Sequence, residues 1–65
     1  MCLAKVYLME PGKDEATFVM ENVTRVTVQD DRVRLTSLLG ASEELPARIV
    51  DMDFMDGRLL LRAPD

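Results

Sequence analysis

Histidine and tryptophan are absent from this chain of 65 residues, and cysteine occurs only once. Without an imidazole, the chain lacks the base of the usual hydrolase triads and the commonest metal ligand of proteins. One thiol allows neither an intrachain disulfide nor a zinc cluster of several cysteines within one copy of the chain. The sequence also lacks a glycine-rich phosphate loop. We therefore expect a protein that is not an enzyme.

Long apolar stretches are missing as well. No uninterrupted apolar run approaches the roughly 18 residues of a membrane-spanning helix, and Lys5 stands where a signal peptide would be apolar. These features predict a cytoplasmic protein without a membrane segment, and a single reduced thiol fits that compartment. The length predicts one domain over residues 1–65 with a small core, so self-association is the expected additional source of stability.

Short alternating segments, rich in β-branched residues, indicate strands rather than helices. The alternation places Val6 on one face of the first strand together with Cys2, Ala4 and Leu8, and it places Val26 and Val28 on the inward face of the third. One face of the fourth strand carries Val33, Leu35, Ser37 and Leu39. Six short strands separated by turn signals predict an all-β fold, a small antiparallel β-barrel. The expected strands cover residues 2–9, 16–20, 23–28, 33–39, 46–55 and 58–63.

The breaks between these strands carry their own signals. Pro11-Gly12 predicts a turn, and Asn22 predicts a bend that separates two strands. Residues 41–44 are expected to form a loop, after which Pro46 begins the fifth strand, where a missing backbone donor is tolerated. Asp56-Gly57 predicts a tight hairpin turn of type I′, which needs positive φ at both central positions.

The last two strands carry two further patterns. Three leucines in succession, Leu59 to Leu61, leave the final strand without a polar face, which predicts burial by the core on one side and by a partner on the other. The acidic residues Asp51, Asp53 and Asp56 lack the spacing of a calcium-binding loop. We expect these carboxylates on the solvated side of the hairpin.

Nucleic-acid binding is a function that small β-barrels often have, through basic grooves and aromatic platforms. The net charge of −4 opposes a phosphate backbone, and aromatic residues make up only 5% of the chain. An RNA-binding surface would depend on Arg25, Arg34 and Arg48 gathering on one face. The acidic turn at residues 30–31 is close enough in a hairpin to neutralise Arg25.

The single cysteine, Cys2, stands beside the chain terminus. If Met1 is retained, a metal ion can bind its amine, the deprotonated Cys2 amide and the thiolate, which closes two fused chelate rings. If Met1 is removed, the metal ion can bind the Cys2 amine and thiolate, which closes one chelate ring. Nitrogen and sulfur donors favour a square-planar ion such as Ni(II). Two chains related by a twofold axis would supply two thiolates and two nitrogens, so metal binding and dimerisation would reinforce each other. The alternative is that Cys2 is a small buried apolar residue of the first strand.

The sequence as a whole resembles the CooT family in its length, its order of strands and its terminal cysteine. The resemblance implies a homodimer of small SH3-like antiparallel β-barrels that binds Ni(II) at the dimer interface through Cys2 of each chain, with the backbone nitrogen of Cys2 or Leu3 nearby. It also implies a metallochaperone role linked to nickel insertion into carbon monoxide dehydrogenase, although some members of the family are labelled predicted RNA-binding proteins. The segments that carry the resemblance are residues 1–6 (MCLAKV), 23–26 (VTRV), 33–40 (VRLTSLLG) and the hairpin 49–61.

Three functional hypotheses follow from the sequence. The first is a homodimeric nickel-binding accessory protein that uses Cys2. The second is a small RNA-binding barrel that uses the arginines. The third is a non-enzymatic interaction module that uses the leucine-rich final strand as a dimer edge.

Overall fold

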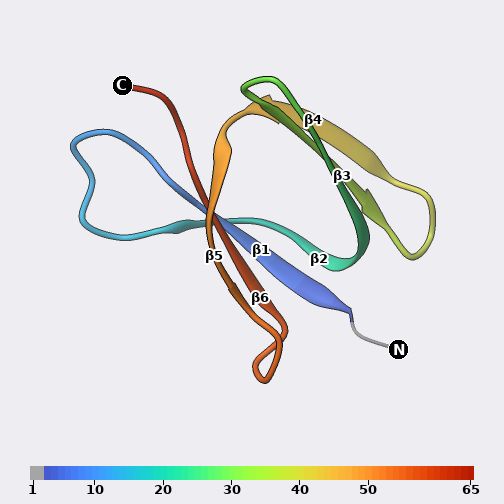
Figure 1. Ribbon diagram of the computed structural model, residues 1–65. Helices are drawn as coiled ribbons and strands as arrows, with labels where there is room; N and C mark the ends of the chain where they lie inside the picture. The colour runs from blue at the N-terminus through green and yellow to red at the C-terminus, as the bar shows by residue number, and fades with distance from the viewer. Residues whose placement is uncertain (1–2) are drawn as a thin grey trace.

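A computed structural model of the protein describes residues 3–65, which form one six-stranded sheet in the order β4-β3-β2-β1-β6-β5 (Figure 1). Neighbouring strands are antiparallel, except that β1 and β6 are parallel. The all-β prediction with six strands is confirmed, and within residues 3–65 the sheet is left open at its two edges, β4 and β5. No helix of this part of the chain is long and apolar enough to cross a membrane. The strands are β1 (Ala4–Met9), β2 (Thr17–Gln29), β3 (Arg32–Ser37), β4 (Ser42–Pro46), β5 (Arg48–Asp53) and β6 (Arg58–Arg62).

The long strand β2 joins two segments that the sequence predicted as separate strands. Asn22 has a φ of 57°, a left-handed conformation that asparagine tolerates better than most residues. At this point β2 has one residue more than β1 between successive paired residues. The extra residue forms a bulge opposite β1, so the strand bends there without ending. The part of β2 before the bend pairs with β1 and the part after it pairs with β3, while Val23, directly after the bend, pairs with both. The bend therefore turns one half of the sheet around the core.

The edge strand β4 occupies most of the segment predicted as a loop at residues 41–44, so that prediction is wrong. Pro46 ends β4 instead of beginning the fifth strand. The segment pairs with β3 in a regular antiparallel register, and Ser37 Oγ accepts a hydrogen bond from Ala41 N at 3.1 Å in the connecting turn. Polar residues are tolerated in β4 because it lies at the sheet edge, where proline also costs little.

The β5–β6 turn, residues 54–57, differs from the predicted type I′ turn. It has four residues between the paired Asp53 and Arg58, and only Gly57 has a positive φ, of 66°. Asp53 Oδ1 accepts hydrogen bonds from the backbone nitrogens of Met55 and Asp56, each at 3.0 Å. This side-chain cap stabilises a longer turn, and Asp56 does not need the left-handed conformation that the prediction required.

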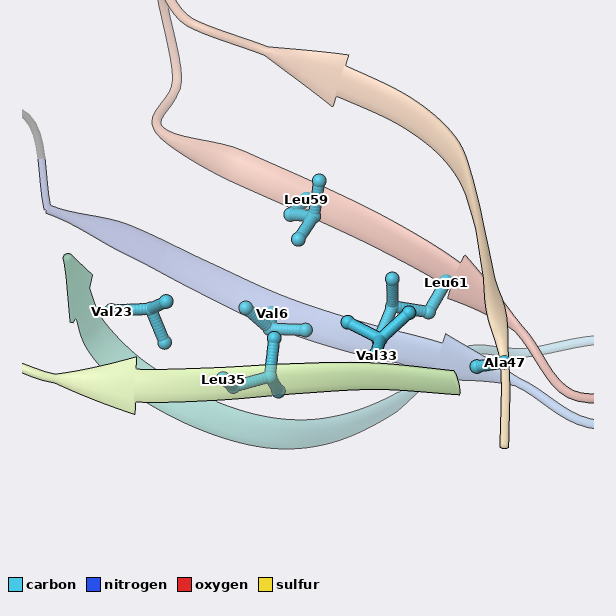
Figure 2. Packing of buried hydrophobic residues seen from close by; sticks show 7 residues of the cluster. All are labelled: Val6, Val23, Val33, Leu35, Ala47, Leu59 and Leu61. Atoms are coloured by element: carbon cyan, nitrogen blue, oxygen red, sulfur yellow. The ribbon is translucent and has the colours of Figure 1, made fainter. Parts of the chain in front are cut away.

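The core lies on the concave side of the curled sheet. Figure 2 shows that its side chains come from β1, β2, β3 and β6 and from the residue that joins β4 to β5. Of the two residues predicted to point inward, Val26 packs partly buried against the core, whereas Val28 is 55% exposed because it lies near the end of its strand. On the predicted shared face of the fourth strand, Val33 and Leu35 are buried, but Leu39 lies beyond the strand and is 95% exposed. Leu60 is half-buried between its two buried neighbours. The buried set is Val6, Val23, Val33, Leu35, Ala47, Leu59 and Leu61.

Candidate functional site

Cys2, the predicted metal ligand, lies outside the residues that the structure describes. Leu3, the next residue, is half-buried and leads directly into β1. Lys5 N donates a hydrogen bond of 2.8 Å to Gly57 O in the β5–β6 turn. Gly57 also lies so close to Leu3 that a Cβ at residue 57 would be 3.1 Å from the Leu3 carbonyl oxygen. The segment that directly follows the single thiol is therefore held against the β5–β6 turn.

A cavity of about 170 Å³, here called the apolar hollow, opens beside Leu3. Two of its lining residues are well exposed, Met52 at 52% and Phe54 at 77%. The apolar side chains that line it come from both halves of the curled sheet: Leu3, Ala4, Val23, Val26, Met52, Phe54 and Leu59. Large side chains of this kind, grouped at an opening, are typical of surfaces that bind another molecule.

The acidic residues of β5 and the β5–β6 turn do not form a metal site. Asp51, Asp53 and Asp56 are exposed, as predicted, and Asp53 Oδ1 is occupied by the two backbone nitrogens that it caps. Among residues 3–65, no group of three or more histidine, cysteine, aspartate or glutamate side chains is placed to hold a metal ion. A thiolate ligand from this chain would have to be Cys2, since the sequence has one cysteine.

The three arginines considered for RNA lie in three different settings. Arg34 Nη2 forms an ion pair with Glu44 at 3.5 Å, beside the shorter pair from Arg32 to the same carboxylate at 3.1 Å. The hydrogen bond from Arg32, together with the positive charges of both arginines, lowers the pKa of the Glu44 carboxyl. Arg25 borders the apolar hollow. Arg48 begins β5.

Two of the aromatic side chains are engaged with each other on the outer side of the sheet. The rings of Tyr7 and Phe18 meet edge to face, with centroids 5.8 Å apart. The Arg58 guanidinium carbon lies 4.9 Å from the centroid of the Tyr7 ring, in cation–π geometry. These contacts join β1, β2 and β6 on the side opposite the core.

The profile of the family described as CO dehydrogenase accessory protein CooT matches residues 1–62. The chain belongs to the CooT family. A crystal structure described as a candidate CooT from Carboxydothermus hydrogenoformans has a TM-score of 0.85 and 22% identity, and the match covers 98% of this chain and 100% of that chain. An uncharacterised protein of Archaeoglobus fulgidus is 33% identical over 42 residues, which are 65% of this chain and 93% of that protein.

Membership of the CooT family confirms the resemblance that the sequence suggested. The family is described as one of accessory proteins of CO dehydrogenase. Sequence reasoning placed no residue of the β5–β6 turn in the site, yet Gly57 fixes Leu3 and Phe54 lines the apolar hollow. The turn signal at Asp56-Gly57 was visible in the sequence, but the contact across to Leu3 was not.

Proposed function

We propose that this CooT-family protein is a homodimeric nickel-binding accessory protein. It binds Ni(II) through the Cys2 thiolate and a backbone nitrogen from each of two chains, and it delivers the metal to carbon monoxide dehydrogenase. The observation that carries the proposal is that the only thiol of the chain directly precedes Leu3, which is fixed against the β5–β6 turn beside the apolar hollow.

The donor chemistry supports nickel as the cargo. In this histidine-free chain, Cys2 offers a soft thiolate with backbone nitrogen donors beside it. Such a donor set suits a square-planar ion, and Ni(II) stands high in the affinity order of divalent metals. One chain supplies too few strong donors for four-coordination. Two chains complete the set, so nickel stabilises the dimer by mass action.

The apolar hollow supports a twofold contact beside the metal site. Met52 and Phe54 expose apolar surface next to Leu3, and a chain of this size gains stability from covering such surface. In a twofold dimer, the patch on one chain contacts the same patch, or the surface next to it, on the other chain. A contact made through this patch brings the two copies of Leu3, and hence the two thiols, to one interface.

A nickel titration tests the site. Wild type, Cys2→Ser and Met55→Leu are titrated with Ni(II) while charge-transfer absorbance from sulfur to metal is followed. Met55→Leu removes a sulfur whose side chain is 96% exposed and leaves Cys2 in place, so it is the matched control. We expect saturation at one nickel per two chains for wild type and Met55→Leu, and no such band for Cys2→Ser. Equal nickel affinity in wild type and Cys2→Ser would refute the proposal.

A further inference from the structure

Arg48 and Arg62 face each other directly across the antiparallel ladder of β5 and β6. Residues opposite each other in such a ladder point to the same side of the sheet, with Cβ atoms about 5 Å apart. The neighbouring pair, Ile49 and Leu61, points the other way, and Leu61 is fully buried. The two arginines are exposed and therefore lie together on the outer side of the sheet.

These two positive charges are left unbalanced within residues 3–65. The ion pairs of this part of the chain join Glu10 to Lys13 and Glu44 to two other arginines, and none includes Arg48 or Arg62. Like charges placed directly opposite each other destabilise a strand pair. The arrangement therefore costs stability in the free chain, and an anion bound between the guanidinium groups would remove that cost.

The space beside the arginine pair is small and has fixed walls. Two adjoining hollows, of about 250 and 260 Å³, both include Arg48 and Arg62. Ala47 N donates to Asp31 O at 3.0 Å and Ala63 N donates to Met9 O at 2.9 Å, so backbone hydrogen bonds hold both sides. Each hollow has room for a small ligand beside both arginines.

The acidic groups at this site stand at its rim. Asp31 borders the first hollow and Asp65 borders the second, and neither forms an ion pair with the arginines in the described chain. The two hollows share the same two arginines, so the site as a whole has two positive charges and these two side-chain carboxylates. An anion held between the two guanidinium groups would lie nearer to the arginines than to these rim carboxylates, so the attraction would exceed the repulsion.

We propose that Arg48 and Arg62 form a binding site for a small oxyanion, either a phosphate or a dicarboxylate. Guanidinium groups donate paired hydrogen bonds to the oxygens of both classes, and such charge-assisted bonds are about twice as strong as neutral ones. The site lies at the end of β6 opposite the apolar hollow, about 13 Å along the strand from Arg58. It is therefore separate from Leu3, the residue that follows the proposed metal ligand.

Titrations of the full chain at low salt test this site. Inorganic phosphate and succinate are added separately to wild type, Arg48→Gln, Arg62→Gln and Arg34→Gln, and backbone amide NMR shifts are recorded. Arg34→Gln is the matched control, since it removes the same charge from an arginine that is paired with Glu44. We expect saturable shifts at residues 47–48 and 62–63 with at least one anion, weakened about tenfold or more in Arg48→Gln and Arg62→Gln and unchanged in Arg34→Gln.

The two anions distinguish the ligand classes, because saturation by phosphate alone, or by succinate alone, names the class that the site takes. Thermal unfolding provides an independent readout. Without added anion, Arg62→Gln should be at least as stable as wild type, and the saturating anion should raise the Tm of wild type but not of Arg62→Gln. Absence of saturation by both anions, or an equal loss in Arg34→Gln, would overturn the proposal.

Discussion

The contact between Gly57 and Leu3 makes Gly57→Ala a direct test of how the start of β1 is positioned. Gly57 has a φ of 66°, and an L-residue in that region costs roughly 1 to 2 kcal/mol relative to glycine. The new Cβ would also lie 3.1 Å from the Leu3 carbonyl oxygen, closer than the 3.4–4 Å of an ordinary contact. Crowding of this kind adds about 1 kcal/mol or more. We therefore expect Gly57→Ala to lose about 2 to 3 kcal/mol.

Gly12→Ala is the matched control for the backbone part of this loss. Gly12 also has a positive φ, of 79°, but a Cβ there meets nothing within 4 Å. The difference between the two variants therefore isolates the contact with Leu3. For a chain of this size, about 1 kcal/mol corresponds to roughly 4 to 8 °C in Tm. Gly57→Ala should thus unfold at a temperature lower than Gly12→Ala by that amount, at equal protein concentration.

The same pair of variants links the turn to metal binding. Relief of the crowding in Gly57→Ala must move Leu3, the residue that follows Cys2, whereas Gly12 lies in the turn that follows β1. Nickel affinity should consequently fall in Gly57→Ala and stay at the wild-type value in Gly12→Ala. Thermal unfolding by circular dichroism and nickel titration provide the two measurements. Equal Tm values for the two variants would refute the argument from the contact.

Two further predictions concern the surface. Phe54→Glu places a charge in the apolar hollow and should shift the protein toward monomer in sedimentation velocity. Leu39→Glu, at a 95% exposed position in the β3–β4 turn, should leave the dimer unchanged. Equal effects of the two variants would show that the hollow is not part of the dimer contact. Glu44 has a pKa lowered chiefly by the hydrogen bond from Arg32, so its contribution to stability is present above the ordinary pKa and is lost as pH falls through the lowered one. As pH falls through this range, the free energy of unfolding measured with urea should therefore decrease less for Glu44→Gln than for wild type. An equal decrease in both proteins would contradict this.

Local sequence pattern was enough to place β1, β3 and β6, since each alternates or is bounded by clear turn signals. It missed β4 because its glutamates resemble a loop, and only pairing with β3 makes the segment a strand. The sequence pattern divided β2 at Asn22, because an asparagine at a bend within a strand and an asparagine at the end of a strand look the same in the sequence.

The candidate sites depended on contacts that no local pattern contains. Cys2 could be singled out from the sequence by its rarity and its chemistry. The approach of Gly57 to Leu3 needs the parallel pairing of β1 with β6. The meeting of Arg48 with Arg62 depends on a register that includes a bulge between Ile49 and Asp51.

The parallel pairing of the first and last strands has a consequence for the order of events during synthesis. β1 emerges from the ribosome before its partner β6, which follows more than fifty residues later in the chain. Contacts of such long range close slowly, because the intervening chain must first be ordered. Leu3 has no turn to rest against until Gly57 has been made. Leu3 therefore acquires its fixed position only after the β5–β6 turn has been made and β6 can pair with β1.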